Sequence, residues 1–237
     1  MKLFTREWGD GARVAVLVHG VMSSSRNWRE LGPELARRGY RVIAVDLPGH
    51  GQSPRAQSYT AELLVESLLE SVPAAPELAI GHSLGGFTLS RAVDRLRPAR
   101  AVYVDPAFSA PRLSLLVRTL AWPASGRLLR STPAKIAKAN PRWAAEDTVI
   151  ESEDFHAFDP AFRAFLLRRD IADVLVGPEH PIVPSLLVLA DGSRLVDPAR
   201  AARLADAGFV VRVVPGATHT VNRDDPAAFL TALDGWI

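Results

Sequence analysis

Short apolar runs alternate with stretches of helical periodicity, and this alternation constrains the fold more than any other feature of the chain. The predicted strands are 14–18, 41–45, 77–80, 101–104, 186–189 and 209–214, and the predicted helices are 24–38, 60–72, 85–96, 198–207 and 226–236. The strand segments are apolar almost throughout, as strands are when both of their faces are covered. The sequence therefore predicts an α/β fold, with a mostly parallel central sheet flanked by helices on both sides.

The alternation is interrupted over residues 109–184. This stretch is rich in proline and aromatic side chains, which are Trp122, Trp143, Phe155, Phe158, Phe162 and Phe165. The sheet is complete without it, so we expect residues 1–237 to form one domain that carries a helical lid, or cap, at about 109–184. A cap over the carboxyl ends of parallel strands would shape whatever binds there.

Composition excludes several classes of protein. The chain has 237 residues, of which 48% are apolar and 23% charged, and it has no cysteine. Disorder, disulfide scaffolds, thiolate metal sites and cysteine nucleophiles are thereby excluded, and we expect neither a metal nor another cofactor. The net charge of +2 is dispersed, which argues against nucleic acid. We see no apolar run near the roughly 18 residues of a membrane span and no secretory signal, so we expect a cytoplasmic protein.

The sharpest local motif runs from Ile80 to Gly86, with the sequence IGHSLGG. It places Ser83 between a predicted strand and a predicted helix, with glycine two residues before and two residues after it. A serine on so tight a turn needs small neighbours at those two positions, and its hydroxyl is presented beside a helix N-terminus. This context favours a nucleophilic serine over a serine that merely caps a helix.

Together with three further blocks, this motif resembles the α/β-hydrolase superfamily. The blocks are His19-Gly20-Val21 after the first predicted strand, DLPGHGQS at 46–53, the serine motif, and Gly216-Ala217-Thr218-His219 after the last strand. The resemblance covers nearly the whole chain outside the lid. It implies a serine-triad enzyme but leaves the reaction open, because this fold supports many chemistries.

A serine hydroxyl needs a base, and the chain has six histidines. His19 and His50 lie in turns, where we expect them to hold loops by hydrogen bonds. His82 adjoins the serine but is expected to point to the other side of its turn, while His156 and His180 have no motif around them. His219 lies in the loop after the last strand, where the resemblance and the chain order both place the base.

The acid of the triad is the weakest assignment. The family places it after the strand that follows the lid, which makes Asp191 our prediction, although the order aspartate–glycine here reverses the usual loop pattern. Asp105, at the end of the strand after 85–96, is the alternative, because some branches take their acid there. Asp197 is third and is better explained as a helix N-cap before Pro198.

The oxyanion hole and the pocket complete the expected site. The residue after the nucleophile and the residue after His19-Gly20 should supply backbone amides to the oxyanion, which assigns Leu84 and Val21. The expected pocket walls are Met22, Phe87 and Phe108 from the core, with Trp122, Trp143 or Phe155 from the lid. For each single aromatic residue, plain packing of the lid is the alternative.

These features predict a serine hydrolase that cleaves a small to medium apolar carboxylic ester through an acyl-serine intermediate. A non-hydrolytic reaction on the same fold, by a lyase or a perhydrolase, and a ligand-binding receptor remain alternatives. A serine nucleophile argues against the dehalogenase and epoxide-hydrolase branches, which use aspartate. The sequence leaves the oligomeric state open.

Overall fold

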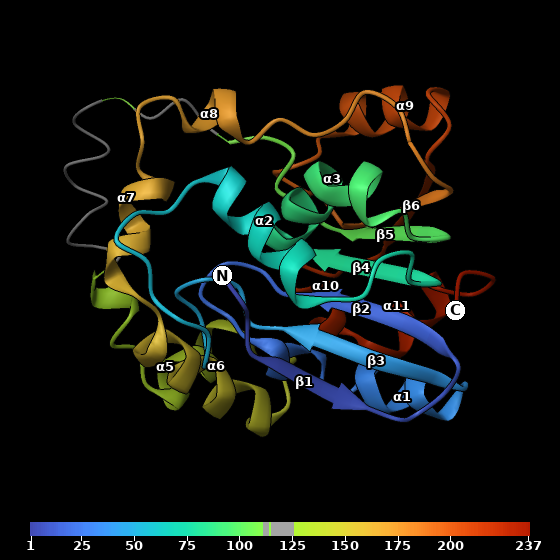
Figure 1. Cartoon of the computed structure of the whole chain (residues 1–237). Helices are drawn as coiled ribbons and strands as arrows, with labels where there is room; N and C mark the ends of the chain where they lie inside the picture. Colours follow the sequence, from blue (N-terminus) through green and yellow to red (C-terminus); the bar gives the residue numbers. More distant parts are fainter. Residues whose placement is uncertain (111–113, 115–125) are drawn as a thin grey trace.

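A seven-stranded sheet forms the centre of the molecule in a computed structural model, which describes residues 1–110, 114 and 126–237 (Figure 1). The strands are β1 (Thr5–Trp8), β2 (Arg13–Val18), β3 (Tyr40–Val45), β4 (Leu78–His82), β5 (Arg100–Val104), β6 (Ser185–Ala190) and β7 (Val210–Val214). Their order in the sheet is β1-β3-β2-β4-β5-β6-β7, and every neighbouring pair is parallel except β1 and β3. The predicted mostly parallel sheet is confirmed.

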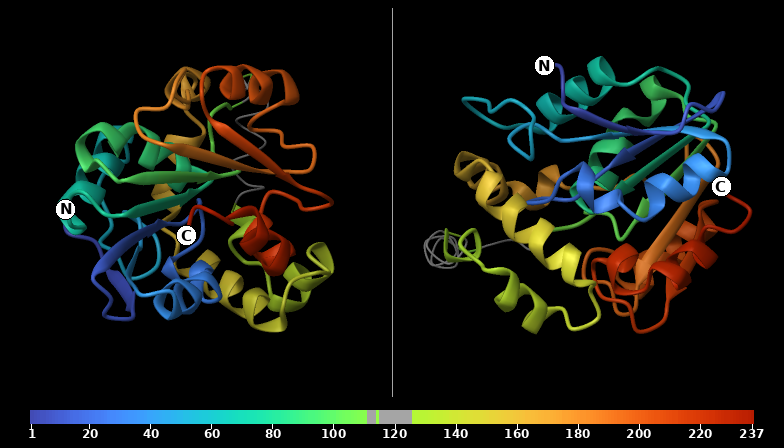
Figure 2. Two further views of the ribbon diagram at one scale, coloured as in Figure 1. Left: turned by 90° about the vertical axis from the view of Figure 1, so that its right-hand side faces the viewer. Right: turned by 90° about the horizontal axis from the view of Figure 1, so that it is seen from below.

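Helices cover both faces of this sheet (Figure 2). They are η1 (Ser25–Trp28), α1 (Leu31–Arg37), α2 (Ala61–Ser71), α3 (Leu84–Leu96), α5 (Pro133–Ala139), α6 (Ala145–Ala157), η2 (Pro160–Phe162), α7 (Arg163–Leu166), α8 (Ile171–Val174), α9 (Pro198–Asp206), α10 (Val221–Asp224) and α11 (Pro226–Ala232). The single helix predicted over 24–38 is instead split into η1 and α1, because Pro33 has no backbone N–H and fits only within the first turn of a helix. No helix in the described residues is both long and apolar enough to cross a membrane.

The inner strands β2 to β6 are largely apolar because the sheet separates two hydrophobic layers. On β2, Ala15 and Leu17 pack into the layer that contains residues of α1, α10 and α11. Val16 and Val18 point the other way, into the layer that contains residues of α2, α3 and α9. Successive side chains on a strand alternate between faces, so a sheet covered on both sides requires apolar residues at every position.

The strand order places β2 and β4 side by side at the point where the direction of winding reverses. In open α/β sheets, ligands bind outside the carboxyl ends of the strands at such a switch point. His19 directly follows β2, Ser83 directly follows β4, and Asp105 directly follows β5. The fold therefore gathers the sequence motifs at one edge of the sheet.

Three helices of the segment between β5 and β6, α5, α6 and α7, lie beyond this edge, on the side of Figure 1 toward which the parallel strands run. Phe158, Phe162 and Phe165 from this segment pack into the same hydrophobic layer as α2 and α3. Trp122 lies outside the described residues.

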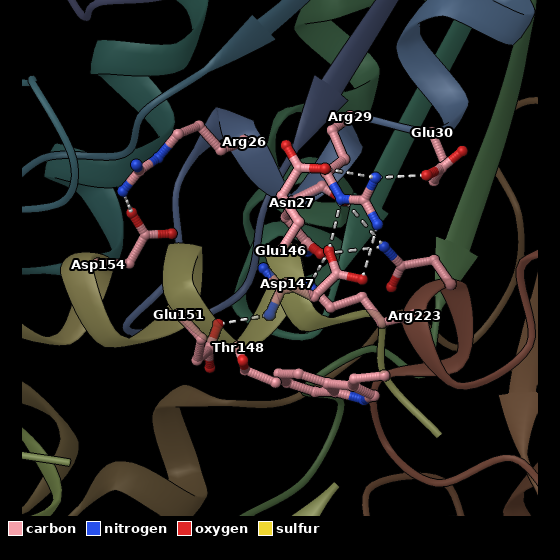
Figure 3. A network of polar contacts seen from close by, with 12 residues as sticks. Arg26, Asn27, Arg29, Glu30, Glu146, Asp147, Thr148, Glu151, Asp154 and Arg223 are labelled. Atoms are coloured by element: carbon pink, nitrogen blue, oxygen red, sulfur yellow. Dashed lines mark hydrogen bonds and ion pairs between the residues drawn. The ribbon is translucent and has the colours of Figure 1, made fainter. Parts of the chain in front are cut away.

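Ion pairs fasten α6 to the rest of the molecule (Figure 3). Arg26 of η1 bonds Asp154, Arg29 bonds Asp147 through its Nε at 2.8 Å, and Arg223 of α10 bonds Glu151. The three acids are spaced i, i+4 and i+7, so they share one face of the helix. Burial raises the pKa of Glu151, although the Arg223 guanidinium opposes the change.

Candidate active site

Ser83 lies in the turn between β4 and α3, and its backbone adopts a conformation that is rare for a residue with a side chain. Its φ is 52° and its ψ is −115°. A Cβ atom on Gly81 would lie 2.5 Å from the carbonyl oxygen of Gly85, and one on Gly85 would lie 2.2 Å from that of Val18. These close approaches agree with the prediction that the turn needs small residues at its two flanking positions.

His219 lies in the loop between β7 and α10, with its imidazole against the serine. Its Nε2 is 2.9 Å from the Ser83 Oγ, within hydrogen-bond distance. Gly216, three residues earlier, has a φ of +69°, a value that glycine adopts without strain, and so allows the chain to turn after β7. The structure thus brings together two of the three residues predicted to form the triad.

The carboxylate that holds His219 belongs to Asp105. The Nδ1–H of His219 donates to Asp105 Oδ2 at 2.6 Å. The expectation that Asp191 fills this place is wrong. β5 is the immediate neighbour of β4, so the residue that follows β5 lies next to the serine turn. Asp191, at the end of β6, instead accepts a hydrogen bond from the Gly216 backbone amide at 2.9 Å.

The environment of Asp105 keeps its carboxylate charged. Only 2% of its side chain is exposed, whereas 45% of the His219 side chain is exposed. Burial alone would raise the pKa of Asp105, but hydrogen bonds from His219, Ser193 and the Ala190 amide bring that pKa below its ordinary value. A buried, charged acceptor at Nδ1 fixes the tautomer in which Nε2 is free to accept the serine proton. Asp197, the third candidate, caps α9 by accepting from the Arg200 amide.

His82 has a structural part in the site that the sequence analysis did not assign to it. Its Nε2 donates to the backbone carbonyl of His219 at 2.8 Å, which ties the histidine loop to the serine turn. The ring is buried, and this burial, with the nearby charge of His219, lowers the pKa of His82 to about 3. The ring therefore stays neutral. This contact joins two loops that are neighbours in space but far apart in the sequence, so no sequence motif indicates it.

The loop after β2 passes directly beside the nucleophile. A Cβ atom on Gly20 would lie 3.1 Å from the Ser83 Cβ. His19 holds this loop through Nδ1, which donates to the Gly20 carbonyl at 2.6 Å, and through Nε2, which accepts from the Leu47 amide at 2.9 Å. Burial lowers the pKa of His19 to about 4, which preserves this neutral tautomer. The predicted structural role of His19 is confirmed.

The two predicted oxyanion donors occupy suitable places around this loop. Leu84 is the first residue of α3, where a backbone N–H has no partner within the helix, and Val21 follows Gly20. Among the expected pocket residues, Phe87 and Phe108 are completely buried in the core, and Met22 packs partly buried against the same layer. Their contact with a substrate stays a prediction.

Trp143, which the sequence analysis expected in a pocket wall, makes specific contacts with two residues of α10. Its indole Nε1–H donates to Asp224 Oδ1 at 2.9 Å, and the Arg223 guanidinium lies 4.7 Å from the centre of its ring. The sequence analysis did not single out Asp224. Its position five residues after His219, on the first helix after the base, is the only signal that the sequence offers.

Serine, imidazole and carboxylate thus form a continuous hydrogen-bonded chain next to a helix N-terminus, an arrangement suited to acyl transfer. Within the described residues, no cluster of three histidine, aspartate or glutamate side chains is placed to bind a metal ion.

Comparison with known proteins gives matches to a family model, to curated relatives and to solved structures. The sequence model of a family described as "Alpha/beta hydrolase family" matches residues 15–232. A 2-(acetamidomethylene)succinate hydrolase from Mesorhizobium japonicum is 27% identical over 255 residues, which cover 99% of this chain and 91% of that protein. A pimeloyl-(acyl-carrier protein) methyl ester esterase from Methylococcus capsulatus is 34% identical over 123 residues, which cover 52% of this chain and 46% of the esterase.

The chain spans less than half the length of several of the curated relatives that it matches, this esterase included. Among solved structures, an N-formylmaleamic acid deformylase from Pseudomonas putida superimposes with a TM-score of 0.75 at 20% identity, covering 97% of this chain and 94% of that one. At that level of identity the likeness shows a shared fold.

Proposed function

The chain belongs to the alpha/beta hydrolase family, and on that premise we propose that it is a serine hydrolase that cleaves carboxylic esters through an acyl-serine intermediate. The observation that carries the proposal is the chain of contacts from Ser83 Oγ to His219 Nε2 at 2.9 Å and from His219 Nδ1 to Asp105 Oδ2 at 2.6 Å. In this proposal Ser83 is the nucleophile, His219 is the general base and then the general acid, and Asp105 fixes the imidazole tautomer.

Acylation begins when His219 Nε2 takes the hydroxyl proton of Ser83 while Oγ attacks the carbonyl carbon of the ester. The negative charge moves to the carbonyl oxygen, where the backbone amides of Leu84 and Val21 stabilise it. The tetrahedral intermediate collapses, the alcohol oxygen leaves with the proton held by His219, and the acyl group stays on Ser83.

Deacylation repeats these steps with water as the nucleophile. His219 removes a proton from the water, the hydroxyl oxygen attacks the acyl carbon, and a second oxyanion forms in the same place. Its collapse expels Ser83 Oγ, which recovers the proton from His219, and a carboxylic acid is released. The carboxylate of Asp105 stabilises the imidazolium at each stage without itself becoming protonated.

We propose a small to medium apolar ester as the substrate class, with residues 109–184 acting as a cap over the site. Support comes from the aromatic residues of this segment and from the position of its helices α5, α6 and α7 beyond the carboxyl edge of the sheet. The relative from Methylococcus capsulatus is named as a methyl ester esterase, which agrees with an ester substrate.

The proposal is tested by steady-state hydrolysis of p-nitrophenyl esters of increasing acyl length, beside the matched p-nitroanilides. We expect turnover of the short esters, loss of that turnover in Ser83→Ala, and slower turnover of the anilides. Ser90→Ala is the matched control, because Ser90 lies on the same helix and donates to the Phe87 carbonyl at 2.8 Å. Undiminished ester turnover in Ser83→Ala would reject Ser83 as the nucleophile, and faster turnover of the anilides would reject the ester assignment.

A further inference from the structure

A chain of hydrogen bonds runs from the segment between β5 and β6 to Thr218, the residue before His219. It begins at Trp143, just before α6, whose Nε1–H donates to Asp224 Oδ1 at 2.9 Å. The other carboxylate oxygen of Asp224 accepts from both the backbone amide and the hydroxyl of Thr218, each at 2.5 Å. Asp224 thus connects Trp143 with the residue next to His219.

The Asp224 carboxylate is well placed to fix the backbone at that point. Only 4% of its side chain is exposed, and it accepts three hydrogen bonds in all. Two of them come from one residue, so both the peptide plane and the side chain of Thr218 are set. The amides of Arg223 and Asp224 donate to the carbonyl of Thr220, the residue after His219. The first turn of α10 therefore holds the backbone on that side of His219 as well.

His219 is consequently held on both sides. On one side, the amide of the preceding residue, Thr218, is held by Asp224, and on the other, the carbonyl of His219 itself accepts from His82 Nε2 at 2.8 Å. The His82 contact comes from the serine turn, within the core fold. The Asp224 contact depends in addition on Trp143, which belongs to the segment between β5 and β6.

Trp143 is itself held by its surroundings. Its ring lies against the Arg223 guanidinium at 4.7 Å, and Arg223 bonds Glu151 of α6. Arg142 places its Nη2 3.6 Å from the Asp224 carboxylate. The position of α6 therefore determines where the indole N–H points.

We propose that Asp224 and Trp143 are positioning residues for the base, so that the docking of α6 sets the orientation of His219 toward Ser83. The proposal rests on the proposed function, because the orientation of His219 matters for catalysis only if His219 is the base. It implies that this segment takes part in assembling the triad as well as in covering the site.

Asp224→Asn and Trp143→Phe test this relay. Asparagine keeps the size of the side chain but offers one acceptor oxygen in place of two, and phenylalanine keeps an aromatic ring while removing the N–H donor. Asp225→Asn is the matched control, because this substitution removes the same charge one residue away. Asp225 caps α11 by accepting from the Ala228 amide at 2.9 Å.

Two measurements are made on each variant: the kinetics of short-ester hydrolysis, and the hydrogen-exchange rate of the Thr218 amide by NMR. We expect Asp224→Asn to lower kcat about tenfold and Trp143→Phe about threefold, with little change in KM, since in this proposal both residues act through His219. The Thr218 amide should exchange faster in both variants, by about the same factors. Asp225→Asn should match the wild type in both measurements.

Trp143→Phe with wild-type kcat and wild-type Thr218 exchange would overturn the relay. Equal losses of kcat in Asp224→Asn and Asp225→Asn would also overturn it, because the effect would then follow charge and not the contact with Thr218. If the wild-type protein hydrolyses no ester, the proposed function fails, while the exchange rates still decide whether Trp143 and Asp224 hold the loop.

Discussion

Replacing Asp105 with asparagine tests the assignment of the acid. The Asp105 Oδ1 accepts from the Ala190 amide at 3.3 Å, while Oδ2 accepts from His219 Nδ1 at 2.6 Å. In the variant, the amide oxygen is drawn to the Ala190 N–H, which turns the NH₂ group toward His219. The imidazole must then present Nδ1 as an acceptor and Nε2–H toward Ser83, and that tautomer cannot accept the serine proton.

The expected loss in kcat is about ten-thousand-fold, as for the same substitution in a serine protease triad, and it corresponds to about 5.5 kcal/mol of transition-state stabilisation. Asp191→Asn is the matched control. Its carboxylate accepts one hydrogen bond, from the Gly216 amide, and the asparagine oxygen can still accept that bond, so we expect a loss of only about threefold.

The assay is hydrolysis of p-nitrophenyl acetate at neutral pH, with circular dichroism to verify that both variants fold. A larger loss in Asp191→Asn than in Asp105→Asn would refute the assignment. Retention of activity within about tenfold of wild type in Asp105→Asn would refute the tautomer argument itself.

Three further predictions concern stability, each measured as the free energy of unfolding in urea. Gly85→Ala places a Cβ 2.2 Å from a carbonyl oxygen of β2 and should cost about 3 kcal/mol, against about 1 kcal/mol for Gly192→Ala, which has no neighbour within 4 Å but a φ of +72°; equal costs would contradict the clash. Burial lowers the pKa of His50 to about 3, so the unfolded chain binds its proton first and stability falls, by up to about 1.4 kcal/mol per pH unit, as the pH drops from 6.5 toward about 3; an unchanged slope in His50→Asn would contradict this. Arg223→Met leaves Glu151 buried without its partner and should cost about 3–5 kcal/mol, which Glu151→Gln in the same chain should largely restore; no recovery would contradict the pairing.

The sequence predicted best the elements that show a pattern within a short stretch of residues. The alternation of apolar runs and helical stretches predicted the parallel sheet, because the inner strands are covered by helices on both faces and are therefore apolar. The glycines around Ser83 predicted the serine turn for a similar reason, since the close approaches lie within the turn or one strand away. The position of His219 followed from its loop after the last strand.

The acid was not predictable in the same way. Both Asp105 and Asp191 follow a strand that ends at the same edge of the sheet, and the sequence alone does not say which carboxylate faces the imidazole. The difference comes from side-chain direction: Asp191 turns to the Gly216 amide, and Asp105 turns to His219. The one sign against Asp191 in the sequence was its loop, in which aspartate precedes glycine, the reverse of the family's usual order.

The sequence analysis did not predict the polar contacts of α6, because the residues that α6 contacts lie far from it in the sequence. Arg29 and Asp147 are 118 residues apart, and Arg26 and Asp154 are 128 apart. A search for apolar periodicity does not register an acidic face, although the i, i+4, i+7 spacing of Asp147, Glu151 and Asp154 is visible in the sequence. The link from Trp143 to Asp224 has no comparable pattern.

Covalent labelling of the nucleophile tests the central claim most directly. The wild-type protein is treated with a fluorophosphonate, digested, and the modified peptide sequenced by mass spectrometry. We predict one phosphonyl group per chain, on Ser83, at a rate that falls steeply in Asp105→Asn because His219 can no longer take the serine proton. Labelling at another residue, or undiminished labelling of Ser83→Ala, would contradict the account.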